Sequence, residues 1–551
     1  MTFVRRILTA AALAFGVIAS ASAYQTAADQ ADPSLIEQEL RQENPVQPKR
    51  KAPLTVSRPE AGSTDIRSEI LAGAIHIDGA SELPPGAFTA VIEKYVARTL
   101  SGADLRSLAS DVANVARSAG FGLATAWIPQ QRIDNGVLRV MLDEGRIDAV
   151  EVTGNGAAAV RPYLEPLAGS RSVSTGALER QLVLAGDVPG IRMGKAKLQR
   201  RGGRNILVVQ AVRDRVRGYA SIDNWGSSTV GPVRARLTAE INGLLAEDDS
   251  LTVGGIVTPM QPKEFALARL SYTKVLGTSG TELTIGGYVA RSEPGGVLAG
   301  RDIDGTSSEF EIGIRHPFLR TRAASLWGSL DFRLLDSSQT RADVKFRDDR
   351  IASLSAGLLA VHRTSDSRTR ARFSLVQGLD VLDSTREGDP LASRIDGSGV
   401  FTKIEFWGEY EQQVGRGLSF MAQVEAQAAN RPLLSSEEMG LGGRYFGRAW
   451  DYREFSGDKG IAGALELRFD LKNLPSPATS AQLYTYVDGG SVGNYEDGLG
   501  GGSLASAGGG IRLWLNGSIE AALEAGFPIS DGADAAADRD PRLSFTLGTR
   551  F

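Results

Sequence analysis

The sequence predicts a β-barrel membrane protein, with a 16-stranded antiparallel transmembrane barrel preceded by two small α+β modules. Three observations favour this fold class. Apolar and polar residues alternate through the last ~300 residues, no apolar run of transmembrane-helix length follows the N-terminal region, and the chain ends in phenylalanine. Because successive strand side chains point to opposite faces, such a chain presents one face to lipid and the other to a polar lumen.

The C-terminal strand carries this alternation clearly. From residue 543 onward, apolar residues alternate with small or polar ones: Leu543, Phe545 and Leu547 against Ser544, Thr546 and Gly548. We expect outer-membrane lipid to contact the apolar face. We also expect the barrel-assembly machinery to recognise the chain through the terminal Phe551.

The N-terminus predicts a secretory signal peptide over residues 1–23. Arg5 and Arg6 precede an apolar stretch over 7–19, and Ala21-Ser22-Ala23 provides a small-residue cleavage site. An uncleaved anchor helix is disfavoured because this stretch is shorter than the ~20 residues that a membrane span needs.

Composition excludes several classes of protein. The chain has no cysteine, which excludes disulfide scaffolds and thiolate metal sites and suits export through an oxidising periplasm. The net charge of −4 provides no excess of positive charge for binding nucleic acid.

Residues 24–70 predict a short helix followed by an extended tether. Asp32-Pro33-Ser34 supplies a cap and a first-turn proline for a helix over residues 33–43. Four prolines and several basic residues then follow between positions 45 and 59, a composition typical of a semi-rigid linker.

Residues 71–146 and 147–215 predict two small modules with the same β-α-α-β-β order. Helical spacing of apolar residues alternates with short strand-like runs, and a turn at Asp134-Asn135-Gly136 separates the last two strands of the first module. The expected strands are 75–77, 123–128 and 137–142, then 147–152, 195–199 and 206–212; the expected helices are 88–100 and 103–119, then 161–167 and 175–184.

Residues 216–551 predict the barrel. In the stretch from Val233 to Asn242, for example, charged residues alternate with apolar ones, and a charge that cannot face lipid must line the lumen. The candidate strands begin near residues 218, 233, 250, 265, 281, 308, 325, 352, 370, 401, 417, 461, 481, 506, 518 and 542.

The connections between these strands predict the orientation of the barrel. Long connections follow odd-numbered strands, at 291–307, 379–399, 429–460 and 490–505, whereas those after even-numbered strands tend to be shorter. In outer-membrane barrels the long loops are extracellular and the short turns are periplasmic. The even strand count therefore predicts that the two modules lie in the periplasm.

Several motifs resemble those of a known family. In the first module these are Gly120-Phe121, Pro129-Gln130, Asn135-Gly136-Val137-Leu138 and Glu144-Gly145-Arg146-Ile147. In the connection over 429–460 they are residues 442–450 and Gly457-Asp458-Lys459-Gly460. The chain resembles the TpsB outer-membrane transporters of two-partner secretion, the ShlB/FhaC/HecB family, in which two polypeptide-transport-associated (POTRA) domains precede a sixteen-stranded barrel.

The resemblance implies a contact between an in-folding loop and the barrel wall. The family writes the loop tetrapeptide V-R-G-[FY]; here it is Gly447-Arg448-Ala449-Trp450, which keeps the arginine and the aromatic residue. The family's strand motif F-x-D-x-G corresponds to residues 486–490, and alternation points Tyr486 and Asp488 inward. The implied loop–barrel lock consists of Arg448, Asp488, Tyr486, Gly457, Asp458 and Gly490. The alternatives are that Arg448 is simply solvated in a long loop and that Asp488 is simply a polar residue of the lumen face.

The resemblance also implies a function. Family members export one large unfolded exoprotein, a TpsA partner of haemolysin or adhesin type, from the periplasm to the cell surface without ATP. The exoprotein docks partly by strand addition at a POTRA edge, for which the candidates are Phe121, Leu123, Trp127 and Ile128, with Lys195–Gln199 as the counterpart. The helix over 33–43 matches the position of the family's pore plug. We expect a monomeric barrel in the outer membrane of a Gram-negative bacterium.

The alternatives are a barrel-assembly insertase of the same superfamily, which normally carries more POTRA modules, and a plugged or passive porin. An enzyme on a barrel scaffold is disfavoured. Residues 489–493 match G-x-S-x-G, but no helix is expected after them, as a nucleophile elbow requires. His76, His316 and His362 lack metal-ligand spacing, and the glycines over 498–502 precede no helix. We therefore expect no catalytic residues, metal or cofactor.

Overall fold

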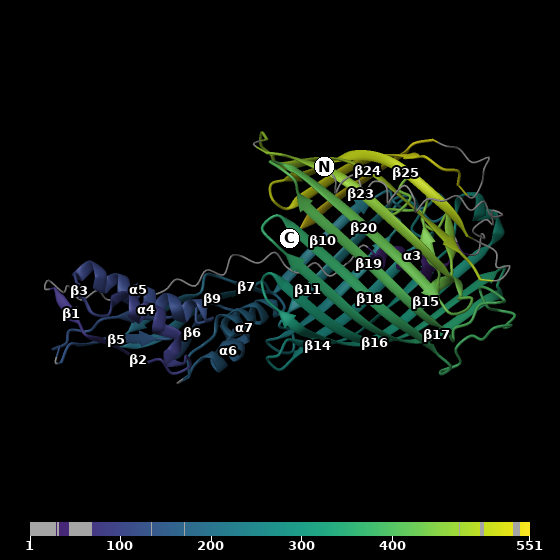
Figure 1. Ribbon diagram of the computed structural model, residues 1–551. Helices are drawn as coiled ribbons and strands as arrows, with labels where there is room; N and C mark the ends of the chain where they lie inside the picture. The colour runs from purple at the N-terminus through teal and green to yellow at the C-terminus, as the bar shows by residue number, and fades with distance from the viewer. Residues whose placement is uncertain are drawn as a thin grey trace.

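The computed structural model describes Asp29 and residues 32–42, 69–133, 135–169, 171–472, 474–495, 501–532 and 540–551. Within these ranges, sixteen antiparallel strands close into a barrel, and two α+β modules extend from one end of it (Figure 1). The predicted fold class is therefore confirmed. The predicted signal peptide and proline-rich tether lie outside the described residues.

The first module packs two helices against a sheet of order β2-β5-β4, in which β2 is parallel to β5 and β4 is antiparallel to it. Helix α5 begins at a capping box made by Ser101 and Asp104. Its buried Leu108 and Val112 share one apolar cluster with Leu138 of the sheet. The elements are β1 (Ile70–Ala72), β2 (Ala74–Asp78), α4 (Thr89–Tyr95), β3 (Arg98–Leu100), α5 (Gly102–Ser118), β4 (Thr125–Trp127) and β5 (Val137–Asp143).

One predicted helix of this module is too long. Apolar spacing predicts a helix over 88–100, but α4 ends at Tyr95. Ala97 adopts a left-handed φ of 58°, and β3 pairs with β1 instead of continuing the helix. Pairing with a distant strand satisfies the backbone groups of β3, and local periodicity contains no information about that partner.

The second module has the predicted β-α-α-β-β order with one additional short strand, β7. Strand β9 is central: it pairs in parallel with β6 and antiparallel with both β7 and β8. Buried Val160, Leu182 and Val209 belong to one cluster that joins the helices to the sheet. The elements are β6 (Ala149–Thr153), α6 (Ala157–Leu164), α7 (Thr175–Asp187), β7 (Ile191–Met193), β8 (Lys197–Arg201) and β9 (Arg204–Arg213).

Each barrel strand pairs with the next, and the last pairs with the first to close the sheet. Every predicted strand has an observed counterpart. The strands are β10 (Val216–Asp223), β11 (Arg234–Asn242), β12 (Asp249–Val257), β13 (Ala266–Leu276), β14 (Thr281–Ser292), β15 (Ile303–Arg320), β16 (Ala324–Arg341), β17 (Val344–Arg363), β18 (Ser367–Leu379), β19 (Thr402–Gln413), β20 (Leu418–Ala429), β23 (Lys459–Leu471), β24 (Ala478–Gly493), β25 (Gly502–Leu515), β26 (Ile519–Pro528) and β27 (Arg542–Arg550).

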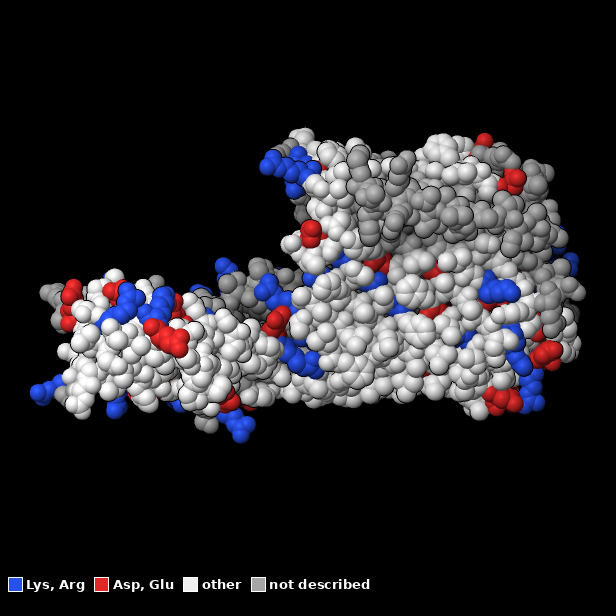
Figure 2. All heavy atoms as spheres, viewed as in Figure 1, with Lys and Arg blue, Asp and Glu red and all other residues white. Residues whose placement is uncertain are grey.

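The barrel is apolar outside and polar inside. Outward residues such as Leu467 and Val487 are exposed, whereas inward Glu466 and Asp488 are buried. On the face drawn in Figure 2, uncharged atoms cover much of the lower barrel wall, and charged side chains gather toward its ends. Among the described residues, no helix has the length and apolarity needed to cross a membrane.

The following loops connect strands at the barrel end opposite the modules. They are loop 1 (224–233), loop 2 (258–265), loop 3 (293–302) and loop 6 (430–458). Loop 6 contains the short hairpin of β21 (Met439–Leu441) and β22 (Phe455–Gly457). Helix α3 (Pro33–Gln42) lies within the barrel (Figure 1).

The second module is joined to the barrel by a buried ion pair. Arg320, at the module end of β15, donates Nε and Nη2 to the two carboxylate oxygens of Asp187 on α7, at 2.6 and 2.9 Å. The carboxylate of Glu179 accepts the backbone N–H of Arg322 in the next turn at 2.7 Å. Bidentate arginine–carboxylate pairs have a fixed geometry, so these contacts orient α7 on the barrel.

We predict that Asp187→Ala loosens this joint. Removing a charge-assisted partner costs about 1.5–3 kcal/mol, so amide hydrogen exchange should quicken in α7 and in residues 321–323, measured by mass spectrometry on the purified protein. Glu151→Ala is the control, because it removes an exposed pair with Arg201 of 2.9 Å within the second module. Unchanged exchange in α7 would contradict the assignment.

Candidate functional site

Arg448, near the tip of loop 6, lies among three carboxylates of the barrel wall. Its guanidinium is 3.1 Å from Asp488 on β24, 3.2 Å from Glu466 on β23 and 3.4 Å from Glu524 on β26. Its side chain is 6 % exposed. A buried charge needs close counter-charges to offset its desolvation, and here three separate strands provide them.

The backbone of loop 6 contacts the same aspartate. Gly447 and Arg448 donate their backbone N–H groups to Oδ1 of Asp488 at 3.0 and 3.4 Å. The Ser506 hydroxyl on β25 donates to the same oxygen. Gly447 has a φ of 79°, a conformation that glycine adopts without strain. Asp488 therefore holds both the side chain and the main chain of the loop tip.

Further arginines and a tyrosine satisfy the other two carboxylates. Arg468 and Arg512 donate to Glu466 at 2.6 and 2.7 Å. The Tyr484 hydroxyl donates to Glu524 at 2.7 Å. The lock is thus part of a network that extends along the lumen wall from β23 to β26.

Tyr486 packs beneath the guanidinium of Arg448, which lies 4.1 Å from the ring centroid. A cation over an aromatic face is stabilised further when both groups are dehydrated. The tyrosine lies over glycines of β25 and β26: a Cβ on Gly508 would come within 2.6 Å of its hydroxyl oxygen, and one on Gly526 within 2.8 Å. Glycine at these positions gives the ring its space.

The other predicted lock residues lie at the base of loop 6. Gly457 and Gly490 allow close backbone approach: a Cβ on Gly457 would lie 2.8 Å from the backbone of Gly493, and one on Gly490 would lie 2.8 Å from Leu441. Asp458 is fully buried but lies in a different cluster from Arg448.

Asp458 anchors the base of the loop. Its Oδ1 accepts from Arg394 and from the backbone N–H of Leu433, both at 2.8 Å, and its Oδ2 accepts from the backbone N–H of Tyr495 at 2.9 Å. Arg394 also pairs with Glu438. Loop 6 is therefore held at two places, by Arg448 at the tip and by Asp458 at the base.

Sequence reasoning missed the partners that complete both anchors. Glu466 and Glu524 lie on inward positions of alternating strands, which is the signal that could have identified them. Arg394 and Glu438 lie in loops, where no periodicity marks an inward side chain.

Helix α3 is bound to the lumen wall and to loop 6. Glu37 pairs with Arg269 of β13, and Asp32 accepts the Ser337 hydroxyl of β16 at 2.8 Å. Gln38 accepts a hydrogen bond from Arg453 of loop 6 at 3.0 Å. The helix predicted for residues 33–43 therefore fills part of the lumen, although residue 43 lies outside the described chain.

The predicted docking edge of the first module is open on one side. Strand β4 pairs only with β5 among the described strands. Trp127 is half-buried, and the Arg200 guanidinium of β8 lies 5.1 Å from its ring centroid. Leu123 and Ile128 are buried in apolar clusters, which leaves Trp127 and the half-buried Phe121 accessible at this edge.

The described residues contain no group of three or more His, Asp or Glu side chains placed to hold a metal ion. Residues 489–493, which match G-x-S-x-G, continue β24 as a strand and form no strand-turn-helix elbow. His76 lies beside Asp78, and His316 contacts Thr281.

These features define a class: an outer-membrane transporter in which a barrel carries periplasmic POTRA domains. The chain belongs to the haemolysin secretion/activation protein family ShlB/FhaC/HecB, which residues 202–513 match. Residues 72–145 match the ShlB-type POTRA domain. The family of two-partner secretion transporters, named above as a resemblance, is therefore confirmed, as is the outer-membrane location with POTRA domains in the periplasm. The loop end of the barrel is accordingly extracellular.

Two curated relatives are similar over different lengths. The heme/hemopexin transporter protein HuxB of Haemophilus influenzae is 23 % identical over 366 residues, which is 64 % of each chain. The chain thus matches less than two thirds of the length of that relative. The outer membrane transporter CdiB of Escherichia coli is 21 % identical over 530 residues, which is 92 % of this chain and 86 % of CdiB.

Solved structures share the fold. CdiB from Escherichia coli aligns with a TM-score of 0.72 and 18 % identity over 96 % of this chain and 100 % of that one. BamA from Haemophilus ducreyi lacking POTRA domains 1–3 aligns with a TM-score of 0.53 and 12 % identity over 88 % of this chain and 100 % of that one. At these identities the likeness concerns the fold alone.

We predict that Arg448→Ala releases the tip of loop 6 while the barrel still inserts. The substitution leaves Asp488, Glu466 and Glu524 without their shared cation, and breaking a buried ion pair costs roughly 3–5 kcal/mol. Protease cleavage within residues 442–454 should rise, while the heat-dependent gel mobility of the folded barrel should persist.

Asp488→Ala should give the same result, and the double variant should be little worse, because the two residues act as a unit. Arg550→Ala is the control, since its pair with Glu520 has an arginine side chain that is 68 % exposed. Additive effects, or a protected loop in either single variant, would count against the lock.

Proposed function

We propose that the chain exports one large unfolded exoprotein, a haemolysin- or adhesin-like partner, from the periplasm to the cell surface. The observation that carries this proposal is the content of the lumen. A separate helix and an anchored loop occupy the pore, as expected for a conduit that must stay closed between export events. Family membership supports the direction of transport.

The POTRA edge supports a docking role for the first module. An unpaired strand edge offers backbone donors and acceptors to an extended chain, and neighbouring side chains select which chain binds. On β4 the half-buried side chains are Thr125 and Trp127, and Trp127 is an aromatic residue of the type enriched at interface hot spots. The buried Leu123 and Ile128 would hold the strand in place and leave recognition to the exposed edge.

The driving force is folding of the exoprotein outside the cell. No nucleotide is available in the periplasm, and the described residues bear no phosphate-binding loop at a helix N-terminus. Folding at the surface would prevent backward movement of each exported segment. We infer that the chain is a transporter without enzymatic activity, outer-membrane lipid and the exoprotein being its partners.

An assembly insertase and a plugged porin are the alternatives. The insertase shares the barrel fold, as the BamA alignment shows, but the family match favours export. A porin has no use for the POTRA domain that residues 72–145 match.

We predict that deleting residues 24–43 raises conductance in planar lipid bilayers. The full chain should show low, fluctuating conductance because α3 occupies the lumen through Glu37, Asp32 and Gln38. A deletion variant with wild-type conductance would refute the plug, although not the barrel.

Deleting residues 71–146 tests the cargo and the direction together. The barrel strands remain, so the protein should still reach the outer membrane. The exoprotein should then be lost from the medium and degraded in the periplasm, while other outer-membrane proteins stay at normal levels in a comparison of the two proteomes. A fall of several unrelated barrels together would instead indicate an assembly factor.

A further inference from the structure

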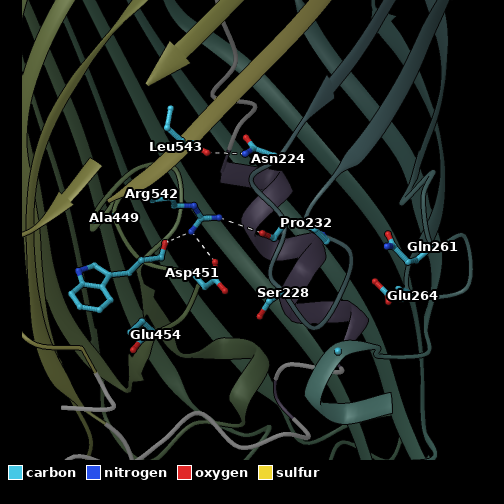
Figure 3. Close-up of a pocket in the computed structure, with 13 residues that line it drawn as sticks. Asn224, Ser228, Pro232, Gln261, Glu264, Ala449, Asp451, Glu454, Arg542 and Leu543 are labelled. Atoms are coloured by element: carbon cyan, nitrogen blue, oxygen red, sulfur yellow. Dashed lines mark hydrogen bonds and ion pairs between the residues drawn. The ribbon is translucent and has the colours of Figure 1, made fainter. Parts of the chain in front are cut away.

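Arg542, the first residue of β27, connects two extracellular loops. Its Nη1 donates to the carbonyl of Trp450 at 2.6 Å and pairs with Asp451 at 2.8 Å, both in loop 6. Its Nη2 contacts the carbonyls of Gly226 and Trp225 in loop 1 at 3.3 and 3.4 Å. One guanidinium therefore bridges the first loop and the sixth, and Figure 3 shows it reaching toward Asp451.

The bridge is well oriented on the loop 1 side. The guanidinium lies 5.4 Å from the ring centroid of Trp225, which is buried. Trp225 is itself fixed, since its backbone N–H donates to Asp223 at 3.1 Å. A planar arginine fork loses little freedom when it is stacked and bonded in this way. We call the contacts of Arg542 with Trp225, Gly226, Trp450 and Asp451 the exit clasp.

A cavity of about 660 Å³ lies beside the exit clasp. Loops 1, 2 and 3 contribute Ser228, Gln261 and Gly296 to its wall, the tip of loop 6 contributes Glu454, and Arg542 itself completes it (Figure 3). Its volume lies within the range of sites that hold small ligands, and its lining mixes polar side chains with apolar ones such as Pro232, Ala449 and Leu543.

One buried donor in this wall has no partner within the described part of the chain. The indole N–H of Trp450, a residue 7 % exposed, has no acceptor among the residues that the structure describes. Buried donors are normally satisfied. A carbonyl of a polypeptide passing through the cavity would supply an acceptor of the required kind.

The exit clasp is weaker than the lock at Arg448. Arg448 lies among three carboxylates and is 6 % exposed, whereas within the described part of the chain Arg542 has one carboxylate partner, Asp451, which is 43 % exposed. The contacts of Arg542 with loop 1 are to neutral carbonyls at the long end of hydrogen-bond distances. We therefore expect the exit clasp to break before the lock when the loops separate.

We propose that the exit clasp of Arg542 holds the extracellular mouth of the pore closed, and that an exported chain leaves through the cavity beside it when the clasp opens. The proposal rests on the export function above. It assigns a gating role to a residue outside both the lock and the plug.

The test is Arg542→Gln in the full-length protein, with Arg550→Gln as the matched control. Both arginines lie on β27, but Arg550 pairs with Glu520 at the periplasmic end. Asp451→Asn is a second variant, which weakens the exit clasp without altering a strand residue. The readouts are hydrogen exchange in residues 224–233 and 449–454, and single-channel conductance in bilayers. Conductance is compared in the background of the deletion of residues 24–43, because α3 otherwise occupies the lumen.

We expect faster exchange in both segments for Arg542→Gln and Asp451→Asn, and openings roughly tenfold more frequent, equivalent to about 1.4 kcal/mol of closing free energy. Arg550→Gln should change neither. Unchanged exchange in either segment would refute the exit clasp. Faster exchange with wild-type conductance would show a structural tie only and would refute the gate.

Neither readout needs an exoprotein. Failure of this test therefore leaves the export proposal intact, and failure of the export proposal leaves the measured gate intact.

Discussion

A charged side chain on a barrel strand must face the lumen, because the other face of the strand contacts lipid. This constraint determines what fills the pore. An arginine at the bilayer midplane costs roughly 2–4 kcal/mol when it faces lipid, so the charges of β23, β24 and β26 face the lumen. There Asp488, Glu466 and Glu524 converge on one point. Three converging carboxylates repel one another unless a cation joins them, and Arg448 of loop 6 is that cation. The buried position of the loop follows from this requirement.

The same need for paired polar groups applies to everything that occupies the lumen. Loop 6 is tied at its tip by Arg448 and at its base by Asp458, both deeply buried. Helix α3 is tied by Glu37 to Arg269 and by Asp32 to Ser337, with both carboxylates buried, and by Gln38 to Arg453 of loop 6. Buried polar contacts therefore hold both the loop and the helix in the pore.

Much of the fold could be predicted from the sequence because successive side chains of a barrel strand alternate between the lipid face and the lumen face. Alternation identifies each strand and assigns a face to each side chain, so Tyr486 and Asp488 could be placed inward from their neighbours alone. Register is not encoded locally. Which inward groups meet depends on how strands are offset, and Glu524 reaches Arg448 from a strand that is not adjacent to that of Asp488.

The ends of helices and the contacts of loops were harder to predict, because they too depend on residues that are distant in the sequence. The helix over 88–100 was predicted from apolar spacing, but a distant pairing of β3 with β1 ended it. The replacement of the family glycine by Ala449 is accommodated because Gly526 lies opposite: a Cβ built on Gly526 would be 3.4 Å from the Cα of Ala449. The contact has room for Ala449 because its partner is glycine, and the sequence alone does not reveal that Gly526 is this partner.

The most direct measurement of the central claim, that the tip of loop 6 lies inside the barrel against its wall, is the accessibility of a thiol at position 449. The chain has no cysteine, so Ala449→Cys creates a single thiol at a residue that is 9 % exposed. In intact outer membranes, we predict that this thiol resists a bulky polyethylene-glycol maleimide, whereas the thiol of Val381→Cys, in the extracellular connection after β18, is labelled quickly. Equally fast labelling of both thiols, in barrels that have inserted normally, would contradict the account.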